Sequence, residues 1–342
     1  MFSDNLELVL KSIFMKFFPL TLILVVISCV DSTTSEQKSP IANSQTVWTA
    51  VDTIDISQVN GNLESGKWTM DVGIYFPSNL DPKFDKVTLP SVMESFRAAK
   101  EIYAPTGVQL NLLWVKTGKV NPEYFSIQAN EVPGIPQTEY VNMYEHAKRH
   151  PARLTEHAKE AFESIVEPAP GDHRTIYLVV LQDVFYPFLE VSEGRNWTMR
   201  TVRTGGLSFP SYSYLNTIEK RYRGVITLTN LKREDRLRGT IAHELGHKVM
   251  NVSHEYKSTN PGYEIFADGG LMLYGDGEDI PSGEEGRWHL ERLHLSPYLY
   301  KENADGSKIW NPDYEEGGHY YDPIYGEKVI YFDAVPEIDE DW

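Results

Sequence analysis

The stretch TIAHELGHKVMNVSHE, residues 240–255, is the part of the chain around which we expect the fold to form. It contains the pattern H-E-x-x-H, in which His243 and His247 are four residues apart and Glu244 follows the first histidine. On an α-helix, which turns by about 100° per residue, both imidazoles lie on one face and can bind one zinc ion with a carboxylate beside them. The other face is apolar, through Ile241, Leu245 and Val249. The pattern therefore predicts a helix between a core and a cleft.

A third zinc ligand is expected shortly after this helix. Asn251 tolerates the left-handed conformation that ends many helices, and His254 comes three residues later. A chain reversal at Asn251 would bring His254 back to the same metal ion. Three protein ligands leave the fourth position of zinc to water, which is the arrangement of catalytic zinc sites.

Farther along the chain, the run GLMLYG contains Met272 and Tyr274. Together with the histidine pattern, this run resembles the metzincin clan of zinc peptidases, which pairs a long H-E-x-x-H-x-x-G-x-x-H motif with a methionine turn beneath the metal. The Met272–Tyr274 spacing is similar to that of astacins and serralysins, whose tyrosine approaches the zinc. The resemblance implies that Met272 lies under the site and that Tyr274 stabilises the tetrahedral intermediate of peptide hydrolysis.

The sequence departs from the metzincin motif at one point. Six residues separate His247 from His254, where the clan has five, and Met250 stands in place of the glycine. One extra helical residue turns the exit direction by about 100°. The longer spacing is similar to that of bacterial IgA-cleaving metallopeptidases, in which an aspartate followed by Glu-Tyr is the third ligand. The matching run in this chain is His254-Glu255-Tyr256.

Two other residues compete for the role of third ligand. Glu264, with Asp268 four residues later, resembles the E-x-x-x-D pattern of thermolysin-like peptidases, in which the aspartate supports a histidine ligand. If Glu264 were the third ligand, the methionine turn at Met272 would have no role at the site. His289 is a further substitute, although its neighbours favour a packing role.

The composition excludes some classes of function. The chain has 342 residues, 41% of them hydrophobic, and a formal net charge of −17. Its length and apolar content suffice for a sizeable core. The negative charge argues against a nucleic-acid partner, because phosphate binding requires clustered lysine and arginine.

The N-terminal residues predict that the protein is located outside the cytoplasm. Residues 17–28 form a mostly apolar run preceded by lysines, too short to span a bilayer and typical of a signal peptide. The run ends in Val-Ile-Ser-Cys, which resembles a bacterial lipobox and implies a lipid anchor at Cys29. The alternative is an ordinary signal peptide with an incidental cysteine. Cys29 is the only cysteine, so an intramolecular disulfide is excluded.

The domain organisation is expected to follow from these motifs. We predict a lipoprotein signal peptide over residues 1–28, a flexible tether over 29–46, a catalytic subdomain with the zinc helix over 47–254, and a C-terminal subdomain with the methionine turn over 255–342. The tether is rich in Ser, Thr, Gln and Lys and shows no apolar periodicity.

The fold class is predicted to be α/β, or more loosely α+β: a metzincin-like twisted mixed sheet with two long helices and a small irregular C-terminal subdomain. Apolar patterns predict strands over residues 68–76, 108–115, 175–181 and 224–229. They predict helices over 89–103, 143–166 with a break at Pro151, 235–250 and 287–295. Because Pro210 interrupts the strand pattern of the segment 205–214, this segment is predicted to be an edge strand or a loop beside one.

The predicted function is a zinc-dependent peptidase of the cell envelope, anchored only through Cys29, with protein or peptide substrates. Zn²⁺ held by His243, His247 and His254 would polarise the scissile carbonyl and activate water. Glu244 would take the proton of that water and deliver it to the leaving amine. The alternative is a zinc-bearing surface protein that binds its partner with little or no turnover.

Overall fold

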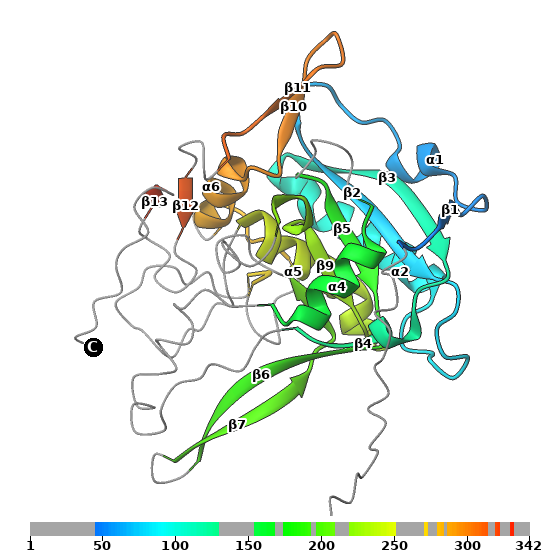
Figure 1. Ribbon diagram of the computed structural model, residues 1–342. Coiled ribbons are helices and arrows are strands. Elements are labelled where there is room, and N and C mark those ends of the chain that lie inside the picture. The colour runs from blue at the N-terminus through cyan, green and yellow to red at the C-terminus, as the bar shows by residue number, and fades with distance from the viewer. Residues whose placement is uncertain are drawn as a thin grey trace, which may run out of the picture. The chain divides into compact units, whose positions relative to one another are not determined.

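Four parallel strands form the centre of the structure, in the order β3-β2-β5-β9 (Figure 1). They are β2 (Trp68–Pro77), β3 (Val108–Gly118), β5 (Ile176–Val180) and β9 (Val225–Leu228). This computed structural model describes residues 45–129, 154–167, 174–192, 196–208, 219–250, 270–272, 279–283, 286–313, 319–321 and 329–331.

Antiparallel strands complete this sheet and make it mixed. On one side β1 (Trp48–Ala50) pairs with β3, and on the other β8 (Gly206–Ser208) pairs with β9. A hairpin of β10 (Tyr300–Glu302) and β11 (Lys308–Trp310) joins β2 at Thr69. Among the described strands, β8 is therefore at the edge of the sheet, as predicted for the described part of the segment 205–214. Residues 209–214 of that segment lie outside the described residues.

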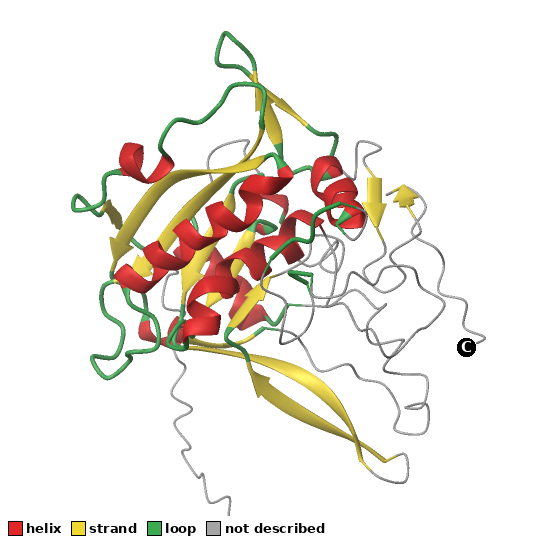
Figure 2. Cartoon of the chain, turned by 180° about the vertical axis from the view of Figure 1, so that it is seen from behind, coloured by secondary structure: helices red, strands yellow, loops and turns green. Residues whose placement is uncertain are grey.

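Two long helices, α2 (Leu89–Tyr103) and α5 (Glu234–Met250), cover one face of the sheet (Figure 2). The helix α4 (Glu156–Ile165) packs into the apolar cluster on the other face. The remaining helices are short: α1 (Ile56–Asn60), α6 (Arg287–Leu295), and the 3-10 turns Ala104–Thr106, Pro122–Phe125 and Lys220–Tyr222.

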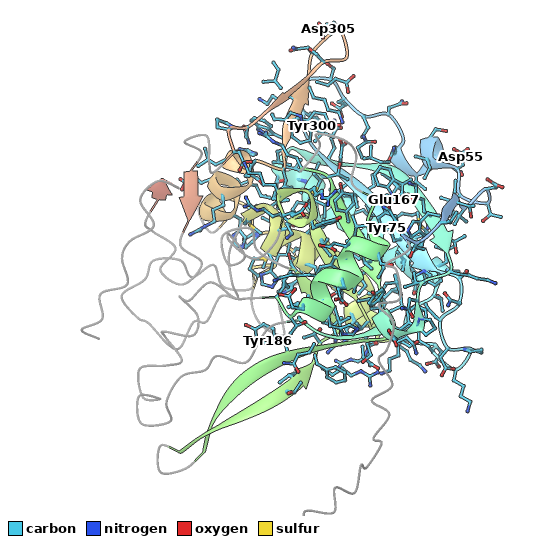
Figure 3. The ribbon with its side chains drawn as sticks, in the orientation of Figure 1. Asp55, Tyr75, Glu167, Tyr186, Tyr300 and Asp305 are labelled. Atoms are coloured by element: carbon cyan, nitrogen blue, oxygen red, sulfur yellow. The ribbon has the colours of Figure 1, made fainter. Side chains whose placement is uncertain are left out.

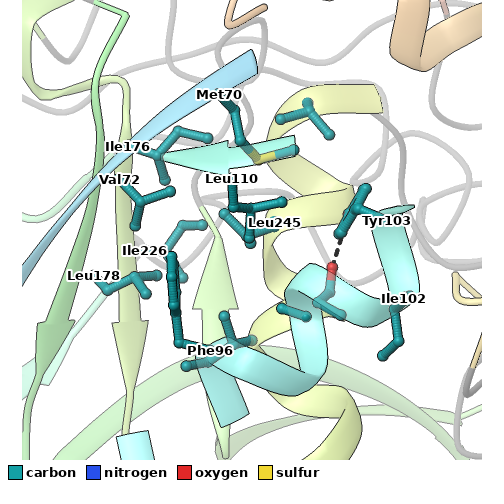
Figure 4. Packing of buried hydrophobic residues seen from close by; sticks show 14 of the residues in the cluster. Met70, Val72, Phe96, Ile102, Tyr103, Leu110, Ile176, Leu178, Ile226 and Leu245 are labelled. Carbon is teal, nitrogen blue, oxygen red and sulfur yellow. Dashed lines mark hydrogen bonds between the residues drawn. The ribbon is translucent and has the colours of Figure 1, made fainter. Parts of the chain in front are cut away.

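Alternation along the buried strands divides their side chains between the two faces. In β5, Ile176 and Leu178 lie in the cluster formed with α2 and α5, whereas Tyr177 and Val179 lie in the cluster formed with α4. This alternation follows from the two-residue period of a strand. Figure 4 shows the first cluster, in which Leu245 of α5 lies among residues of the strands.

The helix α2 begins and packs as its sequence dictates. Thr88 and Ser91 form a reciprocal capping box, and Pro90 occupies the first turn, where no backbone donor is lost to the helix. Apolar residues at helical spacing then face the core: Val92, Phe96, Ala99 and Tyr103.

A long hairpin projects from the sheet (Figure 1). Its strands, β6 (Asp183–Ser192) and β7 (Asn196–Arg203), pair antiparallel along their length, and β4 (Ser126–Gln128) pairs with the base of β6. A further small hairpin joins β12 (His319–Tyr321) to β13 (Val329–Tyr331). The sequence patterns did not predict the β6–β7 hairpin.

A buried carboxylate secures the β10–β11 hairpin to the sheet. Asp71 of β2 accepts hydrogen bonds of 2.8 Å from Tyr300 and from Asn111, and it forms an ion pair with Lys308. Figure 3 shows Tyr300 at the base of this hairpin. Because Asp71 is buried, its negative charge must be balanced by these donors.

The predicted fold class is confirmed: the structure is a mixed α/β arrangement with a mixed sheet and two long helices. The predicted helices 89–103 and 287–295 coincide with α2 and α6. None of the helices in the described residues is long and apolar enough to cross a membrane.

Candidate functional site

The helix α5 carries both histidines of the predicted site. Its apolar residues Ile241, Leu245 and Val249 are buried in the core, which fixes the rotation of the helix. The imidazole rings of His243 and His247 lie side by side, with centroids 4.6 Å apart and planes at 85°. Two imidazoles at this separation can share one metal ion.

A main-chain contact sets the tautomer of His243. Its Nδ1 lies 2.7 Å from the carbonyl oxygen of Leu271. Because a carbonyl oxygen only accepts, Nδ1 carries the proton and Nε2 carries the lone pair that a metal would take. Burial lowers the pKa of His243, which favours the neutral form that metals bind.

Met272 packs against the middle of α5. A Cβ atom added to Gly246 would overlap the sulfur of Met272 and would lie 3.0 Å from Cε of Met250. Beneath the same turn, the hydroxyl of Tyr103 in α2 donates to the carbonyl oxygen of Ala242 at 2.9 Å. The glycine between the two histidines therefore has a structural reason: it leaves room for the sulfur of Met272 against the helix.

Glu244 lies against the edge strand β8. Its carboxylate accepts a hydrogen bond from the backbone N–H of Ser208, and a Cβ atom on Gly206 would lie 2.7 Å from its Oε1. The side chain is buried, and burial raises its pKa to about 8, opposed by the Ser208 hydrogen bond and by the charge of Lys248. The expected general base is thus placed at the boundary between the helix and the edge of the sheet.

Lys248 is a residue of the site that sequence reasoning missed. It is fully buried, and its ammonium donates to the carbonyl oxygen of Arg223. Burial lowers the pKa of Lys248 well below its ordinary value, against the attraction of the Glu244 carboxylate. The signal was present in the spacing, because Lys248 follows Glu244 by four residues and therefore shares its face of the helix.

Several predicted site residues lie outside the described residues. They are Cys29, His254, Glu264, Asp268 and Tyr274. Within the part of the chain that the structure describes, no group of three His, Cys, Asp or Glu residues is arranged to hold a metal ion. His289, the substitute third ligand, is buried on α6 and belongs to no such group. The described site therefore supplies two imidazoles and one carboxylate.

A scan against protein-family models and a search of curated protein sequences both found no match to this chain. The case for a function therefore depends on the chemistry of the site itself.

Proposed function

We propose that this protein is a zinc-dependent peptidase that cleaves extended polypeptide segments. The observation that carries the proposal is the position of Glu244, next to the His243–His247 pair and in hydrogen-bond contact with the edge strand β8. In this proposal the histidine pair would bind the metal, Glu244 would accept the proton and β8 would pair with the substrate, all around residues 243–247 of α5.

The two histidines fit the metal that the motif implies. Burial favours the neutral form of His243, the carbonyl of Leu271 fixes its tautomer, and Met272 packs against Gly246 between the two histidines in the sequence. His254 would be the third ligand, which leaves one position open. A zinc ion bound here would polarise the scissile carbonyl and lower the pKa of the attacking water to about 7.

Glu244 would move the proton during hydrolysis. It would accept a proton from the attacking water and pass it to the nitrogen of the leaving amine. Its contact with Ser208 keeps the carboxylate at the edge of β8, where the scissile bond of a paired peptide would lie. Tyr274 would donate a hydrogen bond to the developing oxyanion.

The edge strand β8 offers main-chain groups to a substrate. Thr229 N–H bonds to Gly205 O, so by alternation the backbone groups of Leu207 face β9 and those of Gly206 and Ser208 face away from it. Of these outward groups, the Ser208 N–H is bonded to Glu244, which leaves the groups of Gly206 and the Ser208 carbonyl for a substrate. An extended peptide that pairs with this edge would run past Glu244. The lipid anchor at Cys29 would place this activity at the cell envelope, outside the cytoplasm.

The test compares zinc content and proteolysis in three purified variants. Glu244→Gln should keep zinc and lose cleavage of denatured β-casein by at least about 10²-fold, because it removes the proton acceptor alone. His243→Ala should lose both zinc and cleavage. His157→Ala, which alters a histidine on α4, is the matched control and should match the wild type.

Two results would contradict the proposal. Equal, background-level cleavage by the wild type and Glu244→Gln, with zinc bound to both, would favour the zinc-bearing binding protein over the peptidase. Wild-type protein without stoichiometric zinc after purification in zinc-supplemented buffer would exclude both functions.

A further inference from the structure

An arginine lies on the face of α5 that carries the histidine pair. Arg236 comes seven residues before His243 and eleven residues before His247. These spacings differ from two and three full helical turns by only about 20°, so the three side chains share one face of the helix. Thr240, which lies between Arg236 and His243 on this face, is partly exposed, as both of them are. A partly exposed stripe therefore runs along α5 from Arg236 to the proposed zinc ligands.

The guanidinium of Arg236 lies against the chain at the start of the edge strand, next to Glu244. A Cβ atom added to Gly205 would overlap Nη1 of Arg236, and one added to Gly206 would lie 2.7 Å from Oε1 of Glu244. Because Gly205 and Gly206 are consecutive, a guanidinium and the proposed proton acceptor lie against neighbouring residues. A substrate held beside Gly206 would therefore pass close to Arg236.

Among the described residues, the side chain of Arg236 has no partner for its charge. Two neighbouring cations are paired: Lys232 with Asp85 at 2.5 Å, and Arg238 with Asp279 at 2.9 Å. Arg236 is also the third residue of α5, where the positive end of the helix dipole disfavours a cation. Neither an ion pair within the described chain nor the stability of the helix therefore explains an arginine at this position.

We infer that Arg236 binds a carboxylate of the substrate, so that the site prefers acidic polypeptide segments. A guanidinium can donate two parallel hydrogen bonds to one carboxylate, and the opposite charges strengthen both. Residues seven apart on a helix are about 10 Å apart along its axis. At about 3.4 Å per residue, the carboxylate would lie about three residues from the scissile bond of an extended chain. This inference rests on the proposed peptidase function, because it requires a substrate that passes Glu244.

The experiment measures kcat/KM for peptides that share one sequence, taken from a segment of denatured β-casein that the wild type cleaves. In each pair of peptides, glutamate or glutamine occupies the same position, and this position is moved stepwise along both sides of the cleaved bond. For the wild type, glutamate should raise kcat/KM by about fivefold or more at a position about three residues from the bond. In a pair that ends at this position, a preference for the free acid over the amide would identify a chain end as the source of the carboxylate.

Charge variants test the role of Arg236 directly. Arg236→Gln should remove the preference for glutamate, and Arg236→Glu should reverse it, so that lysine at the same position is preferred. A reversed preference cannot arise from a loss of folding. Arg238→Gln is the matched control, because it removes the same charge from an exposed position of the same helix, and it should keep the wild-type preference. Equal kcat/KM values for glutamate and glutamine at every position, or an undiminished preference in Arg236→Gln, would overturn the inference.

Binding to the Glu244→Gln variant distinguishes failure of this inference from failure of the proposed function. If β-casein is not cleaved at all, the peptide pairs are made in an arbitrary segment of it and their binding is measured by fluorescence anisotropy. Tighter binding of the glutamate peptide, lost when Arg236→Gln is added, would then show that the carboxylate site exists and that the peptidase proposal fails. If all peptides are cleaved equally by the wild type and bind equally, the peptidase proposal holds and the carboxylate site does not.

Discussion

The sulfur of Met272 occupies the position that a side chain on Gly246 would need. Met272 comes twenty-six residues after Gly246, yet its fully buried side chain packs against that glycine. This contact ties the segment 270–272 to the helix at the same place where Leu271 accepts the hydrogen bond of His243. The orientation of the His243 ring thus depends on a close fit between a glycine and a methionine.

This contact predicts an unusual effect of a glycine-to-alanine change. Alanine at a helix interior normally stabilises by up to about 1 kcal/mol. Gly246→Ala should instead lower the free energy of unfolding by about 1–3 kcal/mol and weaken zinc binding, because its methyl group would displace Met272. Gly239→Ala is the matched control, since an added Cβ there meets nothing within 4 Å. Denaturant titration measures the free energy of unfolding of both variants. Equal stabilisation by the two alanines would contradict the packing of Met272 against Gly246.

A second glycine controls the position of the proton acceptor. A Cβ atom on Gly206 would lie 2.7 Å from Oε1 and 2.8 Å from Cγ of Glu244. Gly206→Ala should therefore push the carboxylate away from Ser208 and lower kcat by about tenfold or more, with zinc content unchanged. Full activity of this variant would show that Glu244 does not need its place against β8. The measurement is steady-state cleavage of denatured β-casein with metal analysis.

The buried Asp71 predicts a large effect far from the histidines. The carboxylate of Asp71 accepts three hydrogen bonds. In Asp71→Asn the amide NH₂ would face a hydrogen-bond donor in place of an acceptor oxygen, which should lower the free energy of unfolding by about 2–4 kcal/mol. Asp305→Asn is the control, because Asp305 is an exposed turn residue of the same hairpin and should change stability by less than about 0.5 kcal/mol. Similar losses in both variants would contradict the anchoring role of Asp71.

Buried tyrosines predict the response to alkaline pH. Burial raises the pKa of Tyr75, Tyr103 and Tyr300 above the ordinary value, with the charge of Asp71 adding to the effect at Tyr300. These phenols remain protonated in the folded state, whereas the unfolded state ionises near pH 10. Their contribution to stability is therefore complete below about pH 10 and is lost as pH rises further. The part of the phenolate absorbance at 295 nm that comes from these three of the twenty tyrosines should appear only together with the loss of circular dichroism. Ionisation of all tyrosines in a protein that keeps its circular dichroism would contradict this.

Local patterns were enough to predict much of the fold. The capping box at Thr88 and the apolar spacing after it define α2 without help from the rest of the chain. The run 175–181 was recognised as a central strand because strands buried on both faces are continuously apolar. The β6–β7 hairpin was missed, because Pro187 weakens the strand pattern and the pairing partner is visible only in three dimensions.

The candidate site was also predictable only in part from local sequence patterns. The spacing of His243 and His247 in the helix was enough to predict that their rings meet. The contacts that orient them come from Leu271 and Met272, and those of Glu244 come from Gly206 and Ser208, all distant in sequence. Such contacts depend on how the sheet, the edge strand and the helix pack, which no local pattern encodes. His254 and Tyr274 stay predictions.

The close approach of β8 to α5 constrains how related chains can diverge. A side chain at Gly205 would overlap the guanidinium of Arg236, just as one at Gly206 would crowd Glu244. The guanidinium of Arg236 is the end of a flexible side chain and can move aside, whereas a side chain at Gly206 would also meet Cγ and Cδ of the buried Glu244, which has no shorter replacement that keeps its reach. Across homologous sequences, position 206 should therefore be glycine wherever position 244 is glutamate, whereas position 205 should vary more freely.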